Sequence, residues 1–404
     1  MIKKSLFLKY QLQNKYLKKN TIINLSKKFD HIFSDVVEDI NNPKKTLNVL
    51  NKIKMNFKQK ELDRFKNFNK IALIGMGGSI LGAEAIHSFL ETNIKKKMFF
   101  FNDLDEKKIL NFKKKENMSK ILFIIISKSG NTIETLSNAF FLDIIKKNTR
   151  NVIIISEKKN NSLFLLSKKF NIFFIEHRKN VGGRYSVLTE VGIVPAYLMG
   201  ANIKKLRSKM SDFLTNKNKK YLKTITTTLA YLAYSKNMNN LIFLNYVPKL
   251  EKFLYWCQQL IAESLGKKGK GFLPVVSNVP KDHHSLLQLY LDGPKDKLFY
   301  IFSSKIKSKA IIRSMDKKDQ NSFLNNKQMS AVKNAQKKAL IKAFTKKKII
   351  FREFIIEDNN EEMLCKLFTY FMIETVIIGK LLNIDPFDQP AVEEVKIFTK
   401  KLLK

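Results

Sequence analysis

Short apolar runs alternate with amphipathic segments along most of this chain, and this alternation limits the possible folds more than any other feature. Segments with helical spacing, such as Ser79–Leu90, separate most of the runs. Strands that alternate with helices are typical of parallel sheets covered by helices. The sequence therefore predicts an α/β fold with parallel sheets flanked by helices. The predicted strands are Lys70–Gly78, Met98–Asn102, Ile121–Ile126, Asn151–Ser156, Asn171–Glu176, Asn240–Tyr246, Gly271–Ser277, Lys297–Ser303 and Lys348–Ile356.

The chain length of 404 residues exceeds one ordinary hydrophobic core, so we expect two domains, with three also possible. A long helical stretch from Lys204 to about Lys236 divides the two sets of strands, which places a boundary near Asn202–Asn216. No repeated residue string relates the two halves. The expected segments are an N-terminal helical segment 1–65, α/β domains 66–202 and 203–382, and a C-terminal loop and helix 383–404.

The formal net charge is +40, and nearly all of it comes from lysines scattered beside Asn, Ile and Phe. This mixture is typical of AT-rich coding bias, although a positive field still favours anionic ligands. The lysines form no single stripe, and we find neither an RNA-binding aromatic signature nor a helix-turn-helix pattern. We therefore do not expect nucleic acid as a partner.

The two cysteines, Cys257 and Cys365, have no CxxC spacing, so neither a zinc site nor a disulfide framework is predicted. The basic N-terminus contains only the short apolar piece SLFL, which is too short for a signal-peptide core. No apolar stretch approaches the roughly 20 residues needed to cross a bilayer. We expect a soluble protein of the reducing cytoplasm, without membrane contact.

A glycine-rich loop, GMGGSILG (Gly75–Gly82), joins the first predicted strand to a helix. Glycines allow a tight turn and a close backbone approach, and free amides at a helix start attract an anion. Ile80 stands where the dinucleotide fingerprint has its third glycine, and the GK[ST] of a nucleotide P-loop is absent. This argues against a nicotinamide-dependent dehydrogenase. Taken alone, the loop could equally be a packing turn.

A second loop, SKSGNTIET, follows the strand ILFIII and opens into another helix. Ser127, Ser129 and Thr132 place three hydroxyl groups there, and Gly130 and Asn131 provide a turn. Hydroxyls and helix-terminal amides bind phosphate oxygens without changing protonation state. An ordinary Ser/Thr-rich helix cap remains the alternative. Two such loops in neighbouring strand–helix units favour a phosphate site.

These two loops, GMGGS followed by SKSGNTIET, resemble the sugar isomerase (SIS) domain, a flavodoxin-like unit that binds phosphosugars. Further strings resemble the glucose-6-phosphate isomerase family in particular, and they appear in the family's order from about residue 70 to the end. The resemblance implies two SIS domains, no metal or cofactor, and a homodimer whose active site takes a His from the neighbouring subunit. The strings are NVGGRYSVLTEVG (Asn180–Gly192), QQLIAESLGKKGKG (Gln258–Gly271), DHHSLLQLYLDG (Asp282–Gly293) and NIDPFDQPAVEEVK (Asn383–Lys396).

The family's reaction interconverts glucose 6-phosphate and fructose 6-phosphate by moving a proton between C1 and C2 through a cis-enediolate. The resemblance implies that Glu263 is the base and that Arg184 stabilises the developing negative charge, since its own charge cannot be lost. From the residues alone, Glu263 could be a solvated helix carboxylate. A surface salt bridge for Arg184 fits poorly with the two glycines before it, which indicate a close backbone approach.

The resemblance also implies that His284 and Lys396 open the sugar ring and that Gln389 contacts the substrate. The implied phosphate-binding residues are Gly78, Ser79, Ser127, Lys128, Ser129 and Thr132. The neighbouring His283 invites a metal-site interpretation, but adjacent residues rarely bind one ion and no third ligand is evident; we interpret it as structural. Ala391 and Val395 stand where the family has glycines, which puts the role of Lys396 in question.

Two other functions remain open. One is an isomerase that also accepts mannose 6-phosphate. The other is a non-catalytic SIS protein that senses phosphosugars, although such a sensor has no need for Glu263, Arg184, His284 and Lys396 together.

Overall fold

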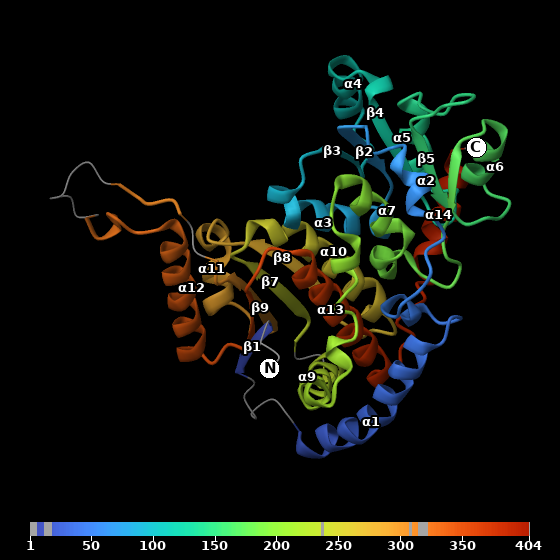
Figure 1. Cartoon of the computed structure of the whole chain (residues 1–404). Helices are drawn as coiled ribbons and strands as arrows, with labels where there is room; N and C mark the ends of the chain where they lie inside the picture. Colours follow the sequence, from blue (N-terminus) through green and yellow to red (C-terminus); the bar gives the residue numbers. More distant parts are fainter. Residues whose placement is uncertain (1–5, 12–17, 236–237, 307–308, 314–321, 404) are drawn as a thin grey trace.

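The computed structural model describes residues 6–11, 18–235, 238–306, 309–313 and 322–403. The chain forms two sheets, each covered by helices on both faces, and the long helices α10 (Glu251–Leu265) and α13 (Glu361–Leu381) lie between the outer layers (Figure 1). The α/β fold expected from the alternating pattern is confirmed.

The first sheet has the order β3-β2-β4-β5-β6, and all its strands are parallel. Numbered within the sheet, this order is 2-1-3-4-5, the flavodoxin-like order. The order reverses between β2 and β4, so these two strands mark the place where a ligand is expected in such a sheet. The strands are β2 (Lys70–Ile74), β3 (Lys97–Phe101), β4 (Ile121–Ile126), β5 (Val152–Ser156) and β6 (Phe173–Glu176).

The second sheet has the order β1-β10-β9-β7-β8 and repeats the same arrangement in its four parallel strands. Here the order reverses between β7 and β9. The remaining strand, β1, pairs antiparallel with β10 at the sheet edge. The strands are β1 (Leu6–Gln11), β7 (Asn240–Asn245), β8 (Leu273–Asn278), β9 (Lys297–Ser304) and β10 (Phe351–Ile356).

The N-terminal segment corrects one expectation, because residues 6–11 form β1 where we predicted helix throughout 1–65. Two helices of this segment agree with the prediction, α1 (Lys19–Asn41) and α2 (Gln59–Asp63). Residues 1–5 and 12–17, for which we also predicted helix, lie outside the described residues. The predicted helix 204–236 is interrupted, since α8 ends at Leu206 and α9 begins at Asn216. The nine predicted strands are confirmed, with small differences at their ends.

The helices supply the layers that bury the sheets. One face of the first sheet packs on α4, α5 and α6, and the other on α2, α3 and α7. The second sheet packs on α11 and α12 on one face and on a large core with α10 and α13 on the other. The helices are α1 (Lys19–Asn41), α2 (Gln59–Asp63), α3 (Leu81–Leu90), α4 (Glu106–Lys115), α5 (Ile133–Phe141), α6 (Ser162–Lys169), α7 (Glu190–Met199), α8 (Ile203–Leu206), α9 (Asn216–Ser235), α10 (Glu251–Leu265), α11 (His283–Asp292), α12 (Met329–Lys346), α13 (Glu361–Leu381) and α14 (Val392–Leu402).

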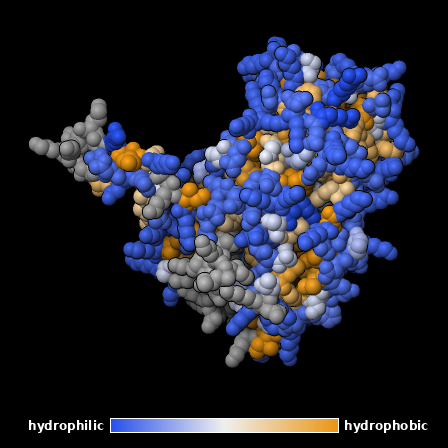
Figure 2. Space-filling view, in the orientation of Figure 1, coloured by the Kyte–Doolittle hydropathy of each residue, from blue (hydrophilic) through white to orange (hydrophobic). Residues whose placement is uncertain are grey.

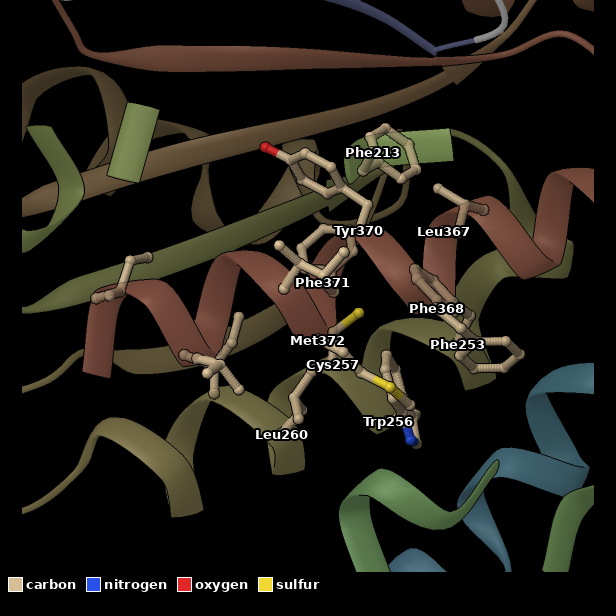
Figure 3. Close-up of a cluster of buried hydrophobic side chains, with 14 of the residues drawn as sticks. Phe213, Phe253, Trp256, Cys257, Leu260, Leu367, Phe368, Tyr370, Phe371 and Met372 are labelled. Atoms are coloured by element: carbon tan, nitrogen blue, oxygen red, sulfur yellow. The ribbon is translucent and has the colours of Figure 1, made fainter. Parts of the chain in front are cut away.

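An aromatic cluster between α10 and α13 fixes the helix that carries Glu263. Trp256 and Phe253 of α10 meet Phe368 of α13 edge-on, with ring centroids 4.7 and 5.4 Å away (Figure 3). All three side chains are fully buried. On its other side α10 packs against α3, so this helix joins the two α/β units. Because burial of large apolar side chains is the main stabilising term in a core, α10 is held in one position.

The surface is dominated by polar and charged groups on the face that Figure 2 shows. None of the described helices is long and apolar enough to cross a membrane. Cys257 and Cys365 are both buried and unpaired.

Candidate active site

The two loops singled out from the sequence leave the carboxyl ends of β2 and β4, which are paired neighbours in the first sheet. The backbone of Gly75 lies so close to the end of β4 that a Cβ there would stand 3.0 Å from the Ile126 carbonyl oxygen. Both loops therefore meet at the place where the strand order reverses. This is the expected ligand position in an open α/β sheet.

The hydroxyls of the second loop gather into one cluster. Ser127 Oγ lies 2.9 Å from Thr132 Oγ1, and Ser129 Oγ lies 3.5 and 3.4 Å from these two oxygens. The backbone amides of Gly130 and Asn131 point at the same group, since they donate to Ser127 Oγ and Ser129 Oγ. Three hydroxyls and the start of α5 together form a donor-rich cradle for an anion.

The Lys128 side chain points away from this hydroxyl cluster. Its Nζ donates to the Lys179 carbonyl at 2.9 Å and lies 3.7 Å from Glu157. Burial lowers the pKa of Lys128, and the Glu157 charge opposes that change. What Lys128 offers to an anion in the cluster is therefore its backbone.

The glycine loop touches the segment that carries Arg184. A Cβ on Gly78 would lie 2.1 Å from the Gly183 carbonyl carbon and 2.5 Å from the Arg184 amide nitrogen. No side chain larger than hydrogen fits there. The close approach expected from the glycines before Arg184 is thus present, and its partner is the loop of Gly78 and Ser79.

Arg184 is the centre of the site's hydrogen-bond network. Its side chain is only 1% exposed, so the surface salt bridge considered from sequence is excluded. Nε donates to Ser264 Oγ at 2.8 Å, and Nη1 donates to Glu263 Oε2 at 3.2 Å and Gln389 Oε1 at 2.8 Å. Nη2 donates to the carbonyls of Pro386 and Asp388 at 2.8 and 2.9 Å. All five donors of the guanidinium are therefore used.

The carboxylate of Glu263 is held from both sides but stays accessible, with 30% of its side chain exposed. Oε2 accepts from Arg184, and Oε1 accepts from Gln259 Nε2 at 2.9 Å. Gln259 stands one helical turn earlier on α10 and also touches the glycine loop, because a Cβ on Gly77 would lie 2.7 Å from its Nε2. A chain of direct contacts therefore leads from the glycine loop to the carboxylate.

The C-terminal loop closes over Arg184. The loop supplies the carbonyls of Pro386 and Asp388 and the side chain of Gln389. The Pro386 carbonyl also accepts a hydrogen bond from the Tyr185 hydroxyl at 3.0 Å. Burial raises the pKa of Tyr185 to about 12, so the phenol stays protonated and donates. Lys267 anchors the loop through Asp388, with Nζ 2.5 Å from its carboxylate. Residues almost at the chain end thus complete the surroundings of Arg184.

The structure brings His284 into no contact with this network. It lies exposed in the first turn of α11, and its ring makes no hydrogen bond within the described part of the chain. Its neighbour His283 accepts from or donates to the Tyr246 hydroxyl, 3.2 Å from Nε2, and its ring meets that of Tyr246. This contact supports the structural interpretation of His283.

Lys396 is also remote from the network. It lies on α14, none of whose residues is buried, and its Nζ pairs with Glu393 of the same helix at 2.6 Å. The neighbouring Val395 is 66% exposed within this helix. Within one chain, Glu263, Arg184 and Gln389 are therefore assembled, whereas His284 and Lys396 are not in contact with them.

Sequence reasoning missed Gln259 and Ser264, which hold Glu263 and Arg184. Gln259 could have been found from its position four residues before Glu263, because side chains at this spacing on a helix lie next to each other. Gln259 Oε1 is buried and has no hydrogen-bond partner among the residues that the structure describes, so it provides an acceptor next to the carboxylate.

Comparison with known proteins shows the family to which the chain belongs. The family model described as "Phosphoglucose isomerase" matches residues 23–276, which is more than half of the chain. The chain belongs to the phosphoglucose isomerase family. A glucose-6-phosphate isomerase of Methanocaldococcus jannaschii is 32% identical over 85% of this chain and 87% of its own length. One from Campylobacter jejuni is also 32% identical, over 82% of this chain and 85% of its own.

Solved structures with the same fold cover nearly the whole chain. A hypothetical protein, TT0462, from Thermus thermophilus superposes with a TM-score of 0.83 at 22% identity, over 98% of this chain and all of that one. A glucose-6-phosphate isomerase from Chlamydia trachomatis superposes with a TM-score of 0.77 at 14% identity, over 99% and 88%. At these identities the likeness shows the fold, including its two-sheet architecture.

Proposed function

We propose that this member of the phosphoglucose isomerase family interconverts glucose 6-phosphate and fructose 6-phosphate. The observation that supports this most is the network of Arg184. It ties a partly exposed carboxylate, Glu263, to a loop that adjoins the hydroxyl cluster. An anchor for phosphate and a base for a carbon-bound proton are the two parts that such an isomerase needs.

The substrate phosphate binds to Ser127, Ser129 and Thr132 and to the backbone near Gly78, Ser79 and Lys128. Because this phosphate does not react, its binding energy serves to hold the sugar carbons against Glu263. The hydroxyls donate at neutral pH without a change of protonation state, so the anchor does not compete with the proton transfer.

Glu263 takes the proton from C2 of the open-chain aldose, and the C1 carbonyl oxygen receives the electrons to give a cis-enediolate. The proton of the C2 hydroxyl moves to O1, and the same carboxyl returns its proton to C1, so that C2 becomes the carbonyl carbon of the ketose. When Glu263 takes the proton it loses its charge, so its bond from Arg184 Nη1 weakens. That donor then turns to the enediolate oxygens, whose charge develops at the same moment.

Ring opening requires a group that both donates and accepts a proton near pH 7, which a neutral His can do. We assign this role to His284 of a second copy of the chain, with Lys396 assisting at the ring oxygen. The exposure of His284 supports an intermolecular role.

The homodimer that this requires is supported by two features of the surface. Residues 309–313 and 322–328 extend away from the body (Figure 1), and Ile311 and Phe323 of this arm are 53% and 66% exposed. Helix α14 likewise exposes an apolar set: Val392, Val395, Ile397, Phe398 and Leu402. A second copy that covers these side chains would bury apolar area and deliver the missing His. Two buried, unpaired cysteines fit the reducing cytoplasm in which we place the enzyme.

A coupled assay with fructose 6-phosphate, run with a metal chelator present, tests the proposal. We expect formation of glucose 6-phosphate at an undiminished rate. Mannose 6-phosphate is the competing substrate, and conversion at a similar kcat/KM would replace the narrow assignment by a bifunctional one. Binding of both sugars without turnover would instead show a phosphosugar sensor.

A further inference from the structure

The second sheet repeats the strand order of the first, with β7 and β9 in the places of β2 and β4. In open α/β sheets, ligands bind outside the carboxyl ends of the strands where the order reverses. In the first sheet this place holds the hydroxyl cluster. The equivalent place in the second sheet has no role in the reaction proposed above.

A cavity of about 350 Å³ lies at that equivalent place. Its walls include Tyr246 and Lys249, from the loop that follows β7, and Ser303 and Ser304 at the end of β9. The first turns of α12 and Asn359, just past β10, complete it. The volume lies within the range of small-molecule sites.

The charge of this cavity is one-sided. Three lysines line it, Lys249, Lys333 and Lys337, and none of its described lining residues is acidic. A larger cavity of about 660 Å³ beside β3 is lined by Glu84, Glu91, Glu116 and Glu251 as well as by lysines, whereas another cavity has Lys295, Lys297, Lys347 and Lys348 and no acidic residue among its described lining residues. What distinguishes the second-sheet cavity is that its lysines lie beside the hydroxyls of Ser303 and Ser304 where the strand order reverses, an arrangement suited to an anion.

Lys337 shows how the positive charge is held in place. Its side chain is 13% exposed, and its Nζ lies 2.5 Å from Glu353 Oε1 and 3.4 Å from Ser303 Oγ. These contacts leave one of the three ammonium donors for a ligand. They also orient Lys337 toward the end of β9, where Ser303 and Ser304 add hydroxyls.

One lining residue has a polar atom without a partner. Asn359 lines the cavity, and its Oδ1 is buried and accepts no hydrogen bond from the described part of the chain. A buried acceptor without a partner is costly, and a ligand hydroxyl would satisfy it once the Asn359 side chain turns toward the cavity. Lysines and hydroxyls for an anion, beside an acceptor for a hydroxyl, match a phosphate monoester on a polyhydroxy carbon chain.

We propose that this second-sheet cavity is a separate binding site for a small phosphorylated sugar or polyol. It would hold the phosphate through Lys249, Lys333 and Lys337 and a hydroxyl through Asn359. The site lies in the half of the chain that does not hold the substrate phosphate, so it can be occupied together with the active site.

Calorimetric titration of the full-length protein with a hexitol 6-phosphate tests this, because that probe has no carbonyl and cannot be isomerised. We expect two equivalents bound per chain. Lys249→Gln combined with Lys333→Gln should weaken one of them about tenfold or more, through the loss of two charge-assisted contacts, and should leave isomerase activity unchanged. Lys338→Gln, an exposed lysine on the same helix outside the cavity, is the matched control and should leave both equivalents.

The remaining variants separate the two sites. Ser129→Ala with Thr132→Val should weaken only the other equivalent. Asn359→Ala should weaken the hexitol phosphate at the second site but not inorganic phosphate, and equal effects on both probes would contradict the hydroxyl contact. A single equivalent per chain, lost with Ser129→Ala and Thr132→Val, would overturn the proposal, as would a second equivalent that survives both lysine substitutions.

Discussion

Two regions of the candidate site differ sharply in how far one chain completes them. The Arg184 side chain is 1% exposed, its five donors are used, and their acceptors come from two distant parts of the sequence, the end of α10 and the C-terminal loop. His284 and Lys396 lie exposed on α11 and α14, without contact to that network. A saturated network keeps its geometry before substrate arrives, whereas isolated groups need a partner to place them. In the proposed mechanism, this difference corresponds to binding and proton transfer prepared within one chain and to ring opening that needs a second chain.

Among the exposed residues of the candidate site, we expect His284→Ala to reduce activity most. We expect kcat for the cyclic sugar to fall about 10²–10⁴-fold, because a general acid–base is lost. His283→Ala is the matched control, since that ring bonds Tyr246, and should reduce kcat far less. Equal amounts of His284→Ala and Glu263→Gln subunits, allowed to exchange, should recover about a quarter of wild-type activity. No recovery in verified mixed dimers would show that the sites are not shared.

We expect Arg184→Lys to disrupt the hydrogen-bond network of Arg184. A lysine has one point charge and three donors, so it cannot hold Glu263, Ser264 and the C-terminal loop together. We expect kcat to fall about 10²–10³-fold, and the free energy of unfolding to fall by about 3–5 kcal/mol because a buried charged network is opened. The exposed Arg150→Lys is the control for both measurements. Wild-type rate and stability in Arg184→Lys would refute the central role of this network.

The phosphate anchor gives a smaller effect. Ser129→Ala with Thr132→Val removes two hydroxyls from the cluster and should raise KM about tenfold or more, with a smaller loss in kcat. Ser137→Ala changes an exposed serine on α5, the helix that follows this loop, and should leave KM unchanged. Steady-state kinetics with fructose 6-phosphate measures both constants. An unchanged KM would place the phosphate elsewhere.

A last effect, on stability rather than on catalysis, concerns His177, buried just after β6, where burial lowers its pKa from 6.5 to about 4. Between these pH values the unfolded chain binds a proton that the folded chain does not. The contribution of a neutral His177 is therefore full above pH 6.5 and is lost as the pH falls towards 4, by about 3 kcal/mol in all. His177→Asn should lack this dependence. Urea unfolding of both proteins at pH 7 and 4.5 measures it, and a stability difference that stays constant with pH would contradict the assignment.

The strands were predictable because runs such as Ile121–Ile126 are buried along their whole length and rich in β-branched residues. Strand β1 was not predictable from the sequence. The strand with which it pairs, β10, lies some 340 residues further along the chain, and we interpreted the Lys- and Asn-rich N-terminal segment as helix. Family motifs supplied Glu263 and Arg184. They did not supply the bonds that use every donor of Arg184, since those bonds depend on where the C-terminal loop returns. In the proposed dimer, His284 and Lys396 would be placed by a second chain, which no local pattern describes.

The most direct test of the account is the turnover of Glu263→Gln, a change that keeps the shape and removes the base. The account predicts isomerisation below about 10⁻² of the wild-type rate, with hexitol 6-phosphate binding at the hydroxyl cluster retained within a few-fold. Turnover near the wild-type rate with the same binding would show that another group carries the proton between C1 and C2.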